Sequence, residues 1–138
     1  MLVSEIRAEK ILDSRGEPSI LVSVETKNGK VQASSPSGKS RGKYEASPFS
    51  SKGVNFSISF INVIGRKIVG DKISLKEFSD LKKIETMVKE FDKTDNWSVV
   101  GGNALFALEA ALLKAMAMDS GVELWQFLNP SAKSIPLP

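Results

Sequence analysis

Cysteine and histidine are both absent from the 138 residues of this sequence. The lack of cysteine excludes disulfide bonds, thiolate zinc sites and cysteine nucleophiles, and it is typical of a protein kept in a reducing compartment. The lack of histidine excludes His-containing catalytic triads and most transition-metal sites. Any metal bound here is therefore expected to be a hard, oxygen-liganded cation such as Mg²⁺.

Aromatic residues are scarce, at 7% of the chain, and they are not interleaved with basic residues in the manner of a nucleic-acid-binding surface. The net charge of +3 is small because 16 acidic residues are interspersed among 19 basic ones. Charged residues interrupt every apolar run before it reaches membrane-spanning length, and Glu5 and Glu9 occupy the place of a leader's apolar stretch. We expect no nucleic-acid partner, no membrane partner and a cytoplasmic location.

The first third of the chain has the pattern of three short strands. Apolar and polar residues roughly alternate over 2–12 and again from Ile20, and a third short strand is expected over 30–35. The pair Asn28-Gly29 predicts a two-residue hairpin of type I′, in which both turn residues have positive φ. These features predict a small antiparallel meander.

Helical patterns follow the strands. Isoleucines at helical spacing predict a helix over 54–70. Next, Ser74 and Glu77 form a capping-box pattern, and apolar residues from Leu75 to Phe91 recur on one face of a second helix.

The third helical segment, over 101–121, is the most apolar part of the chain. Only Glu109 and Lys114 interrupt its apolar residues, so it is expected to be the central, mostly buried helix. Asn103 is predicted to cap its start, and Gly121 to end it in the left-handed conformation.

The segment Ser34 to Ala46, SSPSGKSRGKYEA, contains a pattern that resembles part of a phosphate-binding loop. Gly38-Lys39-Ser40 matches the end of a Walker motif, but Ala33 replaces its first glycine and Pro36 removes a backbone donor. A Walker loop also needs a parallel sheet, whereas strands joined by a tight hairpin are antiparallel. These departures argue against nucleotide binding.

Two other interpretations of this segment remain. In the first, Pro36, Gly38 and Gly42 simply make an irregular surface loop. In the second, a mobile loop closes over an anionic ligand and lends an oxygen to Mg²⁺. The second interpretation also accounts for the hydroxyl groups and cations gathered here, on Ser34, Ser35, Ser37, Lys39, Ser40, Arg41 and Lys43.

Five segments occur in an order that is typical of one enzyme family. They are ILDSRGEPSILVSV, PSGKSRGKYEA, the KGV of 52–54, FDKTDNWSVVGGNALFALEAALLKAMA and the closing SIPLP. Together these segments resemble the enolases, which interconvert 2-phosphoglycerate and phosphoenolpyruvate, and in particular a divergent, archaeal-type member. The resemblance covers nearly the whole chain.

The resemblance implies an α+β fold, a three-stranded antiparallel meander packed on a helical bundle, in agreement with the pattern above. It implies that residues 1–138 form the N-terminal lid domain and that a catalytic barrel domain follows residue 138. In enolases the barrel carries the magnesium-binding carboxylates and the catalytic acid and base. No catalytic residue is therefore expected in 1–138, and the domain alone is expected to be inactive.

The same resemblance assigns a substrate loop and one metal ligand. Ser40 matches the loop serine that binds the second Mg²⁺ as the loop closes on the substrate, and Gly38 and Gly42 supply backbone freedom. Asp13 and Arg15 match the opening motif, where a structural turn is the expected role. The loop residues assigned in this way are Ser37, Gly38, Lys39, Ser40, Arg41 and Gly42.

The chain departs from the family pattern at several positions. Lys39 and Arg41 replace the usual Ala and Thr, which adds two positive charges to the loop. Leu21 replaces a glutamate that in many enolases reaches across the dimer, which leaves the geometry of any homo-oligomer open. The alternatives are a free-standing binding domain of the same fold, without enzymatic activity, and another enolase-superfamily enzyme.

Overall fold

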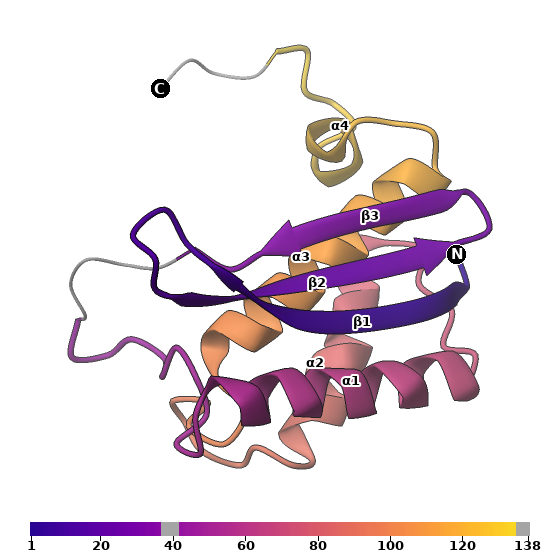
Figure 1. Ribbon diagram of the computed structural model, residues 1–138. Coiled ribbons are helices and arrows are strands. Elements are labelled where there is room, and N and C mark those ends of the chain that lie inside the picture. Colours follow the sequence, from indigo (N-terminus) through magenta and orange to yellow (C-terminus); the bar gives the residue numbers. More distant parts are fainter. Residues whose placement is uncertain (37–41, 135–138) are drawn as a thin grey trace.

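The computed structural model describes residues 1–36 and 42–134 (Figure 1). Three strands, β1 (Val3–Leu12), β2 (Pro18–Thr26) and β3 (Gly29–Ser34), form an antiparallel sheet in the order β1-β2-β3. The helices that follow are α1 (Val54–Gly70), α2 (Leu81–Lys89), α3 (Gly102–Asp119) and α4 (Leu124–Leu128), with a 3₁₀ turn over Phe78–Asp80. The α+β fold and the three-stranded meander are thus confirmed.

One face of the sheet packs against the helices. In Figure 1, α1 runs alongside β1, and α3 crosses behind β2 and β3. Side chains alternate between the two faces of a strand, so one set from each strand enters the core. The fully buried residues include Ile20, Val22 and Val24 of β2, Ile61, Ile64 and Ile68 of α1, and Leu108 and Leu112 of α3.

Helix α1 covers the free edge of β1. The Asn62 side-chain oxygen accepts the Ala8 N–H at 2.8 Å, and the Asn62 amide donates to the Ala8 carbonyl at 3.1 Å. A side chain thus satisfies backbone groups that an edge strand leaves unpaired. Gly65, one turn further along α1, permits this close approach, since a Cβ there would lie 2.8 Å from Ile6 Cβ.

The hairpin between β2 and β3 forms, but its turn lies one residue earlier than predicted. Thr26 pairs with Gly29, so Lys27 and Asn28 are the turn residues, and Asn28 does not have positive φ. The Asn28 N–H donates to the Thr26 hydroxyl at 3.1 Å, and its side-chain amide donates to Asp119 of α3 at 2.6 Å. These two contacts hold Asn28 in a conformation that a type I′ turn does not allow.

The second helix begins later than the capping pattern predicted. The Asp80 carboxylate accepts the backbone N–H groups of Lys76 and Glu77 at 2.7 and 3.1 Å, and Lys83 Nζ lies 2.6 Å from it. The capping box is therefore formed by Glu77 and Asp80, and α2 starts at Leu81. The Asp80 carboxylate thus holds the chain before α2 in a turn, and its negative charge lies at the N-terminal end of the α2 dipole, where such a charge is favourable.

The late start of α2 changes which apolar residues it buries. Leu81, Ile84 and Val88 are buried as expected, whereas Phe78 and Phe91 are 60% and 54% exposed. Both phenylalanines lie outside the α-helix, so the helical period no longer directs them to the core.

The predicted cap at the start of α3 is wrong, whereas the predicted glycine at its end is confirmed. Gly101, not Asn103, is the N-cap residue, and no side chain caps this end. At the other end Gly121 has φ +67°, the Val122 N–H donates to the Ala117 carbonyl and the Gly121 N–H to the Met118 carbonyl. That pair of bonds is a Schellman motif, which confirms the predicted left-handed glycine. None of the helices in the described part of the chain is long and apolar enough to cross a bilayer.

Glu109 places a carboxylate in the apolar middle of α3. Its Oε1 atom is buried and has no hydrogen-bond donor among the residues that the structure describes. Burial, and then the nearby Glu85 carboxylate of α2, raises the pKa of Glu109 to about 7. The folded state therefore favours the protonated acid.

Two substitutions within α1 test the packing against β1. Gly65→Ala is expected to lower the free energy of unfolding by about 1–3 kcal/mol, because the new methyl group overlaps Ile6. The control is Gly70→Ala in the same helix, where nothing lies within 4 Å of the added Cβ. That change is expected to be neutral or to stabilise by up to about 1 kcal/mol. Urea unfolding measures both, and equal effects would contradict the proposed close contact.

A second test concerns the pH dependence that Glu109 introduces. Because the pKa of Glu109 is raised in the folded state, the free energy of unfolding depends on pH through this carboxyl. Its stabilising contribution is complete below the unfolded-state pKa of 4.5 and is lost as the pH rises through about 7. Glu109→Gln is thus expected to raise the free energy of unfolding by about 1–2 kcal/mol at pH 8. This gain is smaller than the free energy that corresponds to the full pKa shift, because the carboxyl is partly solvated. At pH 4 the gain should vanish.

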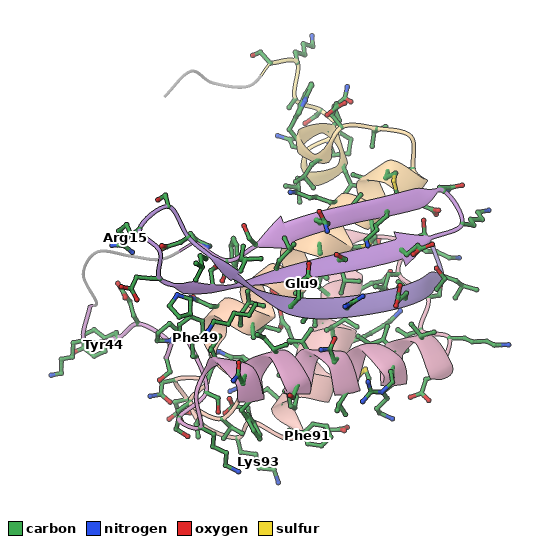
Figure 2. All side chains as sticks on the ribbon, in the orientation of Figure 1. Glu9, Arg15, Tyr44, Phe49, Phe91 and Lys93 are labelled. Carbon is green, nitrogen blue, oxygen red and sulfur yellow. The ribbon has the colours of Figure 1, made fainter. Side chains whose placement is uncertain are left out.

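Thermal unfolding at the two pH values measures this difference. The exposed Glu9, on the outer face of the sheet (Figure 2), provides the control, and Glu9→Gln should change stability by less than about 0.5 kcal/mol at either pH. A gain from Glu109→Gln that is the same at pH 4 and pH 8 would show that the carboxylate is not buried as described.

Candidate functional site

The predicted substrate loop lies between β3 and α1. Ser37, Gly38, Lys39, Ser40 and Arg41 fall outside the described residues, and Gly42 is exposed. The structure describes the segments on either side of these residues, and both are fixed to the body of the domain.

The segment before the loop is anchored on β2. Ser35 is buried, its N–H donates to the Ile20 carbonyl at 3.1 Å, and its carbonyl accepts the Ser19 hydroxyl at 2.8 Å. The meander therefore extends past the end of β3 and holds the chain until Ser35.

The segment after the loop is anchored on the start of α3. The N–H groups of Gly102 and Asn103 donate to the carbonyls of Ser47 and Pro48 at 2.6 and 3.0 Å. The first N–H groups of a helix have no partner within the helix, so here the returning loop backbone caps them. Since the helix already begins at Gly102, the Leu105 N–H, which an Asn103 cap could have accepted, donates instead to the Gly101 carbonyl.

Two glycines make room for this contact. A Cβ on Gly101 would lie 2.6 Å from Phe49 Cα, and one on Gly102 would lie 2.9 Å from Ala46 Cβ. Gly101 also has φ +95°, a conformation that side chains disfavour. Figure 2 labels Phe49 at this junction, on the loop side of the domain.

A buried carboxylate organises the segment from 92 to 100, which supports the returning loop. Asp92 has no exposed surface and accepts four hydrogen bonds: from the Thr94 N–H and hydroxyl, and from the N–H groups of Val99 and Val100. Burial alone would raise the pKa of Asp92, but the hydrogen bonds outweigh it and hold this pKa below its usual value. The folded state therefore requires the ionised form.

The same segment contacts the loop directly. The Ser47 N–H donates to the Asn96 carbonyl at 2.7 Å, and the Ser51 N–H donates to the Ser98 carbonyl at 2.8 Å. Lys89 Nζ lies 3.8 Å from the centre of the Trp97 ring, which adds a cation–π contact between this segment and α2. Asp92 thus fixes the loop through the backbone that it holds.

The turn between β1 and β2 lies at the same end of the molecule. Asp13 Oδ1 accepts the N–H groups of Arg15 and Glu17 at 2.8 and 2.9 Å, and the Arg15 guanidinium lies 3.5 Å from the other carboxylate oxygen. This is the structural turn that the sequence predicted. Figure 2 shows Arg15 and Tyr44 together at the loop end of the domain, where Tyr44 is 92% exposed.

The chemistry available in this region is limited. In residues 1–36 and 42–134, no group of three or more acidic, histidine or cysteine side chains is arranged to hold a metal ion. The described residues can position a loop and cover a ligand, but they do not assemble a metal centre. The loop assignment of Ser37 to Gly42 stays a prediction. Sequence reasoning missed the roles of Asp92 and Gly101, for which the Asp-Lys-Thr and Gly-Gly patterns were the available signals.

Comparison with known proteins gives a consistent result. The profile of the family described as Enolase, N-terminal domain, matches residues 3–128. The chain is 38% identical to the enolase of Methanothermobacter thermautotrophicus over 99% of its own length and 32% of that protein. It is 36% identical to the enolase of Methanosphaera stadtmanae over 93% of this chain and 30% of that protein. It is 37% identical to the enolase of Ehrlichia ruminantium over 99% of this chain and 34% of that protein. The chain thus spans about a third of the length of these relatives.

Replacement of Asp92 tests its role in holding the loop anchor. Asp92→Asn is expected to lower the free energy of unfolding by about 2–4 kcal/mol at pH 7, because the amide presents a donor where donors already converge. The lowered pKa predicts that the wild-type advantage is complete above pH 3.8 and is lost as the pH falls through the lower folded-state pKa.

Asp95, exposed and three residues away, supplies the matched control. Asp95→Asn should change stability by less than about 0.5 kcal/mol in the same urea titration. Similar losses for both variants would mean that the Asp92 hydrogen bonds contribute nothing specific.

Proposed function

Because this chain belongs to the family of enolase N-terminal domains, we propose that it is the lid of an enolase, a lyase that reversibly dehydrates 2-phosphoglycerate to phosphoenolpyruvate. In this proposal residues 1–138 form one domain in the cytoplasm, and a catalytic barrel domain follows them. The isolated domain is inactive, since the acid, the base and the metal carboxylates belong to the barrel.

The observation that carries this proposal is the placement of the loop between two fixed anchors. Ser35 is held on β2, and Ser47 and Pro48 are held on the start of α3. Such a loop can change conformation without disturbing the core, as active-site loops do when they close. The family's loop serine corresponds to Ser40, which lies between these anchors.

Closure matters for this chemistry because removal of a proton next to a carboxylate builds up negative charge. A metal ion and a site without bulk water stabilise that charge. The cations Lys39 and Arg41 would then face the phosphate of the substrate. On the resemblance to the family, we assign this chain one Mg²⁺ ligand, Ser40, and assign the other ligands to the barrel.

A direct test uses the complete product of the gene. Ser40→Ala is expected to lower the kcat of Mg²⁺-dependent 2-phosphoglycerate dehydration by roughly 10²-fold, because a misplaced loop loses a positioned ligand. The control is Ser51→Ala, an exposed serine beyond the anchor, which should leave the rate within about twofold. If Ser40→Ala and Ser51→Ala have equal rates, the role assigned to Ser40 is wrong.

A further inference from the structure

An apolar groove runs along the side of α1 that is turned away from β1. Phe56, Phe60 and Val63 form one wall at helical spacing, and Phe91, which follows α2, forms the other. Val63 and Phe91 are each 54% exposed, whereas Ile64 at the base of the groove is buried. In Figure 2, Phe91 lies on the side of α1 that is remote from the strands. We call this feature the α1 groove.

The size and the aromatic lining of the α1 groove define what can enter it. Its volume is about 200 Å³, and a cavity of about 150 Å³ already holds a benzene ring. The rings of Phe60 and Phe91 meet edge to face, with their centroids 5.5 Å apart and their planes at 76°. A third ring can extend this arrangement, so the groove suits one aromatic side chain from a partner.

Lysine side chains surround the α1 groove. Lys67 lines it, and Lys52 Nζ lies 4.9 Å from the centre of the Phe56 ring. Lys93 is exposed two residues after Phe91, and Figure 2 shows both side chains at the same edge of the domain.

These cations exceed the carboxylates nearby. Asp71 neutralises Lys67 through an ion pair of 2.9 Å. Within residues 1–36 and 42–134, neither Lys52 nor Lys93 forms an ion pair, and the remaining acidic neighbour is Glu90. A partner that carries carboxylates beside its apolar side chain therefore complements the rim of the groove.

A second copy of this chain is a poor occupant. Two copies that meet through this face around a two-fold axis would bring both Lys52 side chains and both Lys93 side chains to one interface. Like charges that face each other across an interface disfavour association. The occupant suggested by the charges is thus a different molecule.

We propose that the α1 groove is a docking site for a peptide segment of another protein, in which one aromatic side chain is flanked by acidic residues. The aromatic side chain fills the groove between Val63 and Phe91, and the flanking carboxylates face Lys52 and Lys93. This inference does not rest on the proposed function.

Fluorescence anisotropy with the complete gene product tests the apolar part of the site. The probe is a fluorescein-labelled peptide with one tryptophan between two pairs of glutamates. Phe91→Ala is expected to weaken its binding at least about tenfold, because the anchor loses one wall of its pocket. The control is Phe78→Ala, in the 3₁₀ turn, since Phe78 is 60% exposed and does not line the groove. Its binding should stay within about twofold of wild type.

Charge reversal provides a second measurement, on surface residues whose replacement leaves the core intact. Lys52→Glu is expected to weaken binding by about threefold to tenfold at low salt, and the difference should shrink as the salt concentration rises. Lys82→Glu on α2 makes the same change in net charge away from the groove, so it should have less than about a twofold effect.

Three results would overturn the proposal. The first is no saturable binding of the peptide to the complete product. The second is equal binding of peptides in which alanine replaces the tryptophan or lysines replace the glutamates. The third is equal weakening by each variant and its control, which would mean that the peptide binds elsewhere on the surface.

Discussion

The ionised carboxylate of Asp92 is the interaction on which the loop end of this domain depends. Four donors converge on it, and three of them are backbone N–H groups of the segment that it organises. A buried charge is tolerated only when it is hydrogen-bonded, so the folded state favours the conformation in which these donors point at the carboxylate. That conformation presents the Asn96 carbonyl and Gly101 to the returning loop. The backbone at Ser47 is thus held in place through Asp92, whose four hydrogen bonds come from residues 94, 99 and 100.

The domain consists of a packed base and a loop whose flanking segments are attached to that base. The sheet and α1 form the base of the domain, with Asn62 bonded to the edge of β1, and the backbone on either side of the loop is bonded to the body of the domain at Ser35 and at Ser47. Functional loops are commonly positioned in this way by a scaffold that does not itself react.

Sequence patterns predicted the elements whose side chains point into the core and failed where a distant group competes with a local signal. The three strands, α1 and the Gly121 terminus follow local rules and form as expected. The cap assigned to Asn103 was wrong because the Ser47 and Pro48 carbonyls, more than fifty residues earlier, accept the N–H groups of Gly102 and Asn103, and α3 therefore starts at Gly102 with Gly101 as its N-cap. The loop assignment, made on a cluster of glycine, serine and cations, stays a prediction. The role of Asp92 could not be predicted from local patterns, since donors at residues 94, 99 and 100 meet its carboxylate only after folding.

Helix α3 joins these features, because one element carries two contacts. The N–H groups of its first turn bond to the Ser47 and Pro48 carbonyls, and its buried face fills the core against the sheet. The segment after the loop is therefore attached to the same helix that the core holds in place. A substitution that shifts α3 within the core would thus also shift the backbone at Ser47.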